Sequence, residues 1–299
     1  MNKHLFLTAA TLALLNFGCS GPASKSGGNR MDVVVSIPPQ EYLVKAIGGD
    51  LVNVKTVMGS NANPESFEPT VASMLSISDA DIYIPMGTLD FEKNLIDKLR
   101  ENSPGLNIAY PLDGINLLYG THGDCEHNHH DHDSDHHHHD AADPHVWSSP
   151  KNMAIMARNI AGILSSADPD NKAAFAQRCD SIINRIDSIG DVLSRSISGS
   201  GQRSFMVWHP SLSYLANDYS LNQIVVGSHN KELSVKQLQD RIDQASNSGA
   251  TLLFIQKEFD TSQAKTLDRQ IKATIIELNT MSEDWEAEVK KITDGFSKK

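Results

Sequence analysis

Residues 169–197 read PDNKAAFAQRCDSIINRIDSIGDVLSRSI, and this stretch organises the fold that the sequence predicts. Its apolar side chains recur every three or four residues, as along one face of a helix: Phe175, Cys179, Ile182, Ile186, Ile189, Leu193 and Ile197. Asp168 before Pro169 is typical of a helix start, and Gly199 is the expected stop. One helix of this span would be about 43 Å long. We therefore expect a rigid connector between two units. A coiled-coil seam is the alternative, disfavoured because the stripe is not repeated elsewhere.

Strand-like and helix-like segments alternate on both sides of this connector. The expected strands are 32–37, 51–58, 81–84, 107–109, 204–208, 223–226, 251–255 and 274–278. The expected helices between them are 41–47, 70–78, 91–100, 150–164, 211–218, 234–248, 262–271 and 282–296. This alternation predicts an α/β fold with parallel sheets: an N-terminal lobe over 31–167, a connecting helix over 168–198 and a C-terminal lobe over 199–299. Ligands of such folds bind at loops that follow strand ends, so we expect a site in the cleft between the lobes.

The segment from His122 to Asp140 has the composition of a metal-binding loop. Histidine makes up half of residues 122–139, carboxylates lie between the histidines, and Cys125 is the one apolar residue from 123 to 140. Such a segment cannot bury a face, so we expect a disordered loop over 121–142. Imidazole suits zinc, copper, nickel and iron. The candidate ligands of this auxiliary low-affinity site are His122, Cys125, His127, His129, His130, His132, His136, His137, His138 and His139.

Composition narrows the function. Of the 299 residues, 39% are hydrophobic and 21% are charged, which is typical of a soluble globular protein. The formal net charge of −11 argues against nucleic acid or anionic lipid as a partner and favours cations. Cys179 lies on the apolar stripe and is expected to be buried, and the cysteine spacing indicates no disulfide framework.

The first eighteen residues are typical of an export signal, with Lys3 followed by a mostly apolar run over 5–17. Gly18-Cys19-Ser20 resembles a bacterial lipoprotein processing site, at which Cys19 becomes the lipidated first residue. Asn16 occupies the position at which that pattern usually has Leu, so plain secretion is the alternative. Residues 19–30 then form a flexible tether. We expect a lipoprotein anchored in the membrane through Cys19 and facing the periplasm or cell envelope.

Four polar residues stand where the chain leaves a predicted strand or approaches a helix. Glu65 lies in the turn after 51–58, His145 precedes a helix start, His209 follows 204–208 directly, and Asn279 follows 274–278. A single histidine after a strand is more often structural than a ligand. Here each histidine lies within two residues of a tryptophan and precedes a helix, which favours a shared site. We interpret His229 as part of a solvated loop.

Five segments carry a resemblance to a known family: SIPPQEYLVKAIGGD (36–50), NPESFEPT (63–70), SDADIYIPMG (78–87), DPHVWSSPKN (143–152) and VWHPSLSYLANDY (207–219). Together they resemble the metal-binding receptors of bacterial zinc and manganese ABC importers, over nearly all of the chain from Asp32. The DPHVW segment after a histidine-rich loop is most similar to the zinc members. The resemblance implies two lobes, a rigid connecting helix and one metal ion between the lobes, which is handed to an ABC permease with its ATPase. We expect a monomer that is not an enzyme.

The resemblance also assigns ligands. His145 and His209 match two metal ligands of the family, Glu65 stands where the family has the histidine of a P-H-x-F-E-P motif, and Asn279 stands where it commonly has an aspartate. Glutamate ligates zinc and slightly favours harder ions, whereas asparagine would be a weak neutral ligand or leave a water. Zn²⁺ is therefore the expected ligand, with Mn²⁺ or Fe²⁺ as the alternative.

Two other functions compete with import. Two histidines, a carboxylate and an open position also describe the zinc of a metal-dependent hydrolase. The sequence contains no HExxH helix and no nucleophile elbow, however. The other is a metal buffer or cell-adhesion protein without a permease.

Overall fold

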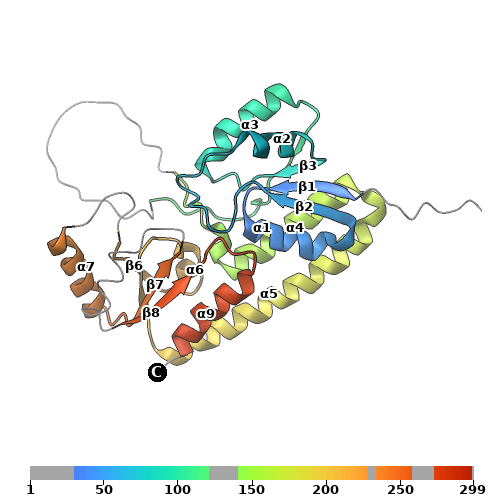
Figure 1. Cartoon of the computed structure of the whole chain (residues 1–299). Helices are drawn as coiled ribbons and strands as arrows, with labels where there is room; N and C mark the ends of the chain where they lie inside the picture. Colours follow the sequence, from blue (N-terminus) through green and yellow to red (C-terminus); the bar gives the residue numbers. More distant parts are fainter. Residues whose placement is uncertain (1–29, 121–140, 228–233, 258–272, 298–299) are drawn as a thin grey trace, which may run out of the picture.

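The computed structural model describes residues 30–120, 141–227, 234–257 and 273–297. They form two lobes, each built on a four-stranded parallel sheet (Figure 1). The first sheet has the order β2-β1-β3-β4, with β1 (Met31–Val35), β2 (Val52–Thr56), β3 (Ile82–Ile84) and β4 (Asn107–Ile108). The second has the order β6-β5-β7-β8, with β5 (Ser204–Val207), β6 (Asn222–Val225), β7 (Leu252–Gln256) and β8 (Thr274–Leu278). The predicted α/β fold with two lobes is confirmed.

Helices cover both faces of the sheets. They are α1 (Pro38–Gly48), α2 (Val71–Ser78), α3 (Asp90–Asn102), α4 (Pro150–Ala167), α5 (Lys172–Ser200), α6 (Ser213–Asp218), α7 (Val235–Asn247) and α9 (Trp285–Ser297). Single 3-10 turns occupy Gly49–Leu51, Val146–Ser148 and Pro169–Asn171. The export signal, the lipidation site Cys19, the histidine-rich segment 122–140, His229 and the helix predicted at 262–271 lie outside the described residues.

Capping residues fix several helix starts where the sequence predicts them. The Ser149 side chain accepts a hydrogen bond from the Asn152 amide at the start of α4, and Ser234 caps α7 in the same way. Helix α1 begins at Pro38 rather than at the predicted 41, because a proline in the first turn needs no amide hydrogen bond. Helix α9 begins at Trp285 rather than at 282, because the chain first turns between Asn279 and Ser282.

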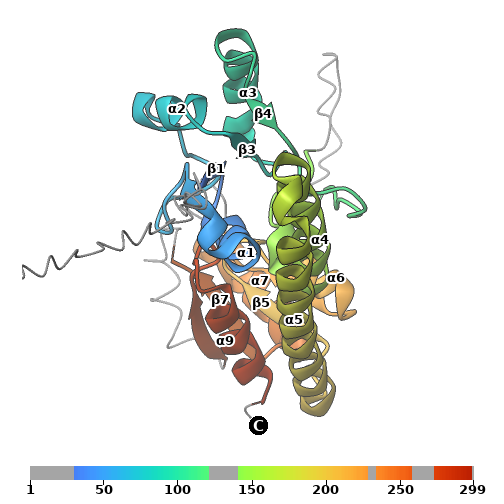
Figure 2. The ribbon, with the colours of Figure 1, turned by 90° about the vertical axis from the view of Figure 1, so that its right-hand side faces the viewer.

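Helix α5 is the predicted connector, and it runs along both lobes (Figures 1 and 2). It packs against α1 and α4 in the first lobe and against α9 in the second. The expected stop at Gly199 is wrong, since the helix continues to Ser200. It ends where Gly201 takes a left-handed conformation with φ of 71°, which glycine adopts without steric cost. The connector is therefore one unbroken 29-residue helix.

One hydrophobic core extends through both lobes. It includes Val35 and Ile47 in the first lobe, Phe175 on α5, and Phe205 and Phe296 in the second lobe. Separate clusters lie on the outer faces, one between the first sheet and α2 and α3, the other between the second sheet and α7. Cys179 is 5% exposed within the shared core, as predicted for a small apolar residue. Within the described ranges, no helix combines the length and apolar character needed to cross a membrane.

The described chain begins again at residue 141, inside the loop predicted over 121–142. Ala142 pairs with Tyr119 in an isolated antiparallel bridge. The amide of the next residue, Asp143, donates to the Leu118 carbonyl at 2.8 Å. The loop boundary predicted at 142 is therefore wrong by at least one residue, because backbone pairing ties the chain down before the DPHVW segment begins.

Candidate metal centre

Three of the four predicted ligands lie together where the lobes meet. Glu65, His145 and His209 each offer one donor atom, and these atoms lie within 4.8 Å of one another. Glu65 comes from the turn after β2 in the first lobe, and His209 lies two residues after the end of β5 in the second. The side chains of the two histidines are 1% and 2% exposed and that of Glu65 is 24% exposed, so the carboxylate faces the open side of the site.

Asp143 sets the orientation of the His145 ring. One carboxylate oxygen, Oδ1, accepts the His145 amide at 2.9 Å and lies 2.9 Å from Nδ1 of the same residue. Both residues are fully buried. A carboxylate beside Nδ1 keeps the proton on that nitrogen, so Nε2 carries the lone pair that can bind a metal ion.

Asp143 is itself held by both lobes. Its amide donates to Leu118 of the first lobe, and its carbonyl accepts the hydroxyl of Tyr214 on α6 at 2.8 Å. Burial raises the pKa of Tyr214 to about 12, so the phenol remains a donor at physiological pH. Nearby, the Thr88 hydroxyl donates to the Pro144 carbonyl at 3.4 Å. The segment that carries His145 is thus fixed on both sides.

His209 lies beside both of the other predicted ligands, His145 and Glu65. The rings of His209 and His145 meet edge to face with centroids 5.1 Å apart. His209 Nε2 lies 3.3 Å from Oε1 of Glu65. The Glu65 backbone amide donates to the Asn63 side-chain oxygen at 2.9 Å, which fixes the backbone of the turn at Glu65.

The spacing suits a divalent ion. Zinc binds imidazole and carboxylate at about 2.0–2.2 Å, so two donors of a tetrahedral site lie roughly 3.3 Å apart. The separation between His209 Nε2 and Glu65 Oε1 is 3.3 Å. A carboxylate and two neutral imidazoles leave one positive charge on a bound dication, and they leave a fourth coordination position to another ligand.

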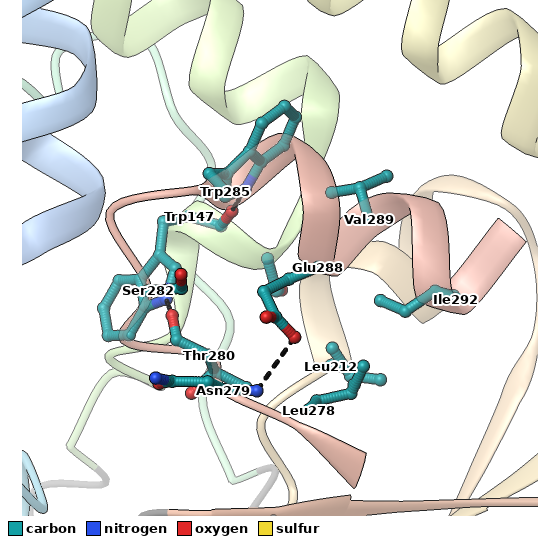
Figure 3. A pocket seen from close by; sticks show the side chains of 11 residues that line it. Trp147, Leu212, Leu278, Asn279, Thr280, Ser282, Trp285, Glu288, Val289 and Ile292 are labelled. Carbon is teal, nitrogen blue, oxygen red and sulfur yellow. Dashed lines mark hydrogen bonds between the residues drawn. The ribbon is translucent and has the colours of Figure 1, made fainter. Parts of the chain in front are cut away.

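Asn279 lies in the loop after β8, beside Thr280 and Glu288 (Figure 3). Its side-chain oxygen accepts the Met281 backbone amide at 3.1 Å, and its backbone amide donates to the Glu288 carboxylate at 2.9 Å. The side chain therefore shapes the turn in this structure. Its predicted role as a metal ligand stays a prediction.

A pair of tryptophans fastens the His145 segment to this loop. The indole of Trp147 donates to the Thr280 carbonyl at 2.8 Å, and the indole of Trp285 donates to the Trp147 carbonyl at 2.8 Å (Figure 3). Trp285 also contacts Tyr42 of α1, with ring centroids 6.0 Å apart. These two hydrogen bonds and the ring contact connect residues on the two sides of the site.

Sequence reasoning missed the residues that hold the ligands. The sequence predicts no role for Asp143 in the DPHVW segment, and none for Gln256 at the end of β7. Gln256 accepts the His209 amide at 3.0 Å. A usable signal existed for it, because a polar residue at the end of a buried parallel strand lies at the ligand-binding edge of the sheet.

Two α/β lobes on a long helix, with three metal donors gathered at their junction, define a two-lobed metal-binding receptor. Within that class, the chain belongs to the family of the periplasmic zinc-uptake complex component A, whose model matches residues 33–294. The family is a transport component and not an enzyme, as the sequence predicts.

Several known proteins are similar. The zinc-binding lipoprotein AdcA of Streptococcus pneumoniae strain R6 is 26% identical over 294 residues, which is 97% of this chain and 57% of AdcA. This chain therefore spans little more than half of that relative. The high-affinity zinc uptake system protein ZnuA of Bacillus subtilis is 28% identical over 93% of this chain and 88% of its own. A crystal structure of ZnuA is 29% identical, with a TM-score of 0.77 over 90% of this chain and all of that one.

Proposed function

We propose that Glu65, His145 and His209 bind one Zn²⁺ ion with high affinity and that the chain delivers it to an ABC importer. The observation that carries the proposal is the donor group itself, in which three side chains from separate segments lie within 4.8 Å of one another. Two of these residues, His145 and His209, are nearly fully buried. A buried histidine pair beside a carboxylate has no use in packing and suits a borderline cation.

Zinc is the favoured ion. The relatives AdcA and ZnuA are named as zinc-binding and zinc-uptake proteins. The imidazole nitrogens that His145 and His209 each offer also suit zinc. The carboxylate of Glu65 moves the donor set towards harder ions, so Mn²⁺ or Fe²⁺ is the alternative cargo. We further propose a fourth ligand from Asn279 or from water.

A receptor of this kind needs a partner in the membrane. We propose that the loaded chain docks as a monomer on an ABC permease and releases the ion to it. ATP hydrolysis by the partner ATPase would drive the transport. Glu65 is the most exposed of the three ligands, which suits it to be the first to let the ion go.

We also propose that processing at Cys19 anchors the mature chain by a lipid on the outer side of the inner membrane, with 19–30 as a tether. AdcA, one of the relatives, is named a lipoprotein. A Cys19→Ser variant should then appear in the soluble fraction of the cell envelope. A variant that stays with the membrane would contradict the anchor.

The histidine-rich segment is assigned a supporting role. Its many equivalent imidazoles must be ordered anew for each ion, at about 1–2 kcal/mol per fixed residue, so it should hold several ions weakly. Deletion of residues 122–140 should remove weak sites from a zinc titration and keep one tight site. Loss of the tight site would mean that the segment supplies the fourth ligand.

The decisive test is a zinc titration against a competing chelator with single alanine variants. His145→Ala and His209→Ala should each abolish tight one-to-one binding, and Glu65→Ala should weaken it strongly. Glu68→Ala is the matched control, because Glu68 is an exposed carboxylate three residues along the same loop. Retained tight binding in either histidine variant, or an equal loss in the control, refutes the proposed centre.

A further inference from the structure

We propose that Gln256 is a positioning residue for the metal ligand His209, and this inference rests on the proposed function. Gln256 ends β7, next to the strand that carries the ligand, and it is fully buried. Its side-chain oxygen accepts the His209 amide at 3.0 Å. Its side-chain nitrogen donates to the Ser211 hydroxyl at 2.9 Å. One amide group thus holds the residue that binds the ion and the residue two positions later.

The backbone at His209 needs such support because the sheet ends there. On the β7 side the Trp208 amide donates to the Phe254 carbonyl at 2.9 Å, and on the β6 side the Trp208 carbonyl accepts the Gly227 amide at 3.1 Å. Pro210 has no N–H with which to extend the ladder. The His209 amide would therefore be a buried donor at the point where the chain leaves the sheet, and the Gln256 oxygen accepts it in place of a backbone carbonyl.

The primary amide is suited to this position. It accepts on one side and donates on the other, so it fixes the orientation of the turn as well as its distance from β7. Ser211 completes the turn, since its amide donates to the His209 carbonyl at 2.8 Å. Gln256 fixes the His209 backbone, which carries the imidazole. A shift of this turn would therefore move the donor nitrogen of His209 away from Glu65 and His145.

The effect belongs to the metal site rather than to folding alone. Removal of a group that supports a metal ligand typically weakens metal binding 10- to 100-fold. Met is close to Gln in length and fits an apolar interior, but it offers neither hydrogen bond. Gln256→Met should therefore weaken zinc binding by about 10- to 100-fold. It should also change the visible absorption spectrum of the Co²⁺-loaded protein, which reports ligand geometry.

The first lobe contains a matched control. Gln40 is also fully buried, and its side-chain oxygen accepts the amides of Ser36 and Ile37 at 3.0 and 3.1 Å. Its nitrogen donates to the Ile84 carbonyl at 2.9 Å. Gln40→Met removes comparable buried hydrogen bonds without touching the turn at His209. It should lower the melting temperature and leave the zinc dissociation constant within about threefold of the original, a change below 1 kcal/mol.

Two further variants keep the test open if Gln256→Met does not fold. Gln256→Glu retains an acceptor for the His209 amide, and the Ser211 hydroxyl can turn to donate to it, so tight binding and the Co²⁺ spectrum should be restored. Ser211→Ala removes only the bond that orients the amide, and it should weaken zinc binding several-fold.

The outcomes separate the two proposals. If the unaltered chain binds no zinc tightly, the proposed function fails. If it binds zinc and Gln256→Met binds equally well with an unchanged Co²⁺ spectrum, the positioning role is overturned. The role is also overturned if Gln40→Met weakens binding as much, or if Gln256→Glu gives no rescue.

Discussion

At the scale of single residues, the two histidines proposed as ligands are held in different ways. His145 is oriented through its ring, because a buried carboxylate stands beside Nδ1. His209 is oriented through its backbone, because Gln256 accepts its amide. Glu65 is less buried than either histidine, since 24% of its side chain is exposed. The site therefore combines two fixed ligands with one that is open to solvent.

The carboxylate of Asp143 should be required for tight binding. In Asp143→Asn the amide oxygen still accepts hydrogen bonds, but the negative charge that strengthens Nε2 as a donor is lost. Zinc binding should weaken by about tenfold or more, as measured by chelator competition. Asp218→Asn is the control, since Asp218 accepts the nearby Ser149 hydroxyl and contacts no ligand of the proposed centre. Equal affinity of Asp143→Asn and the parent protein would show that the ring needs no such partner.

Glu65 should set metal preference. Glu65→His replaces an oxygen donor with an imidazole, so the ratio of zinc to manganese affinity should rise, by roughly tenfold. Paired titrations with the two metals measure this ratio. Glu65→Gln, which keeps the size and removes the charge, should weaken both metals. A shift of the ratio towards manganese in Glu65→His would remove Glu65 from the ligand set.

At the scale of the elements, the end of β5 is constrained by residues of both neighbouring strands. Gln256 of β7 holds it on one side, and Gly227 after β6 approaches it on the other. A Cβ on Gly227 would lie 2.2 Å from the Trp208 carbonyl oxygen and 2.7 Å from its ring. The close approach of β6 to the residue before His209 therefore requires glycine.

Gly227→Ala should disturb both the fold and the site. The added methyl group has to push Trp208 aside, which should cost about 1–3 kcal/mol of stability and weaken zinc binding. Thermal unfolding and zinc titration measure the two effects. Gly162→Ala is the matched control, because nothing lies within 4 Å of a Cβ there and the residue is inside α4. That variant should gain roughly 0.5–1 kcal/mol. A neutral Gly227→Ala would contradict the constraint.

The sequence predicts the elements well where local signals are strong. The apolar stripe of α5, the proline and serine at the start of α4, and the capping box of α7 all place helices correctly. Boundaries fail where tertiary contacts decide. Gly199 stays helical because the left-handed residue that ends α5 is the next glycine, Gly201. Helix α9 starts late because Asn279 and Glu288 shape the preceding turn.

At the scale of the whole molecule, the lobes share one core. One cluster of buried apolar side chains includes residues of β1, α5 and β5. At the junction, the Trp285 indole donates to the Trp147 carbonyl, and the Trp147 indole donates to the Thr280 carbonyl. Such continuity does not follow from sequence periodicity, which predicts each lobe separately. For the same reason, the sequence predicts Glu65, His145 and His209 as candidates, whereas the hydrogen bonds from Asp143 and Gln256 to the two histidines are seen only in the folded structure.

A shared core predicts a single unfolding transition for the metal-free protein. Because neither lobe buries its inner face alone, the two should unfold together. Far-ultraviolet circular dichroism and tryptophan fluorescence should give coincident melting curves. Trp285→Phe should lower the midpoint without splitting the transition. Two separate transitions in the parent protein would mean that the lobes are independent.

The central claim is that one ion lies between the lobes on Glu65, His145 and His209. The most direct measurement is anomalous diffraction at the zinc edge from crystals of the zinc-loaded protein. The account predicts one strong peak at this junction, about 2.0–2.2 Å from Nε2 of each histidine and from the Glu65 carboxylate. A zinc peak only at other residues, with the three donors unligated, would contradict it.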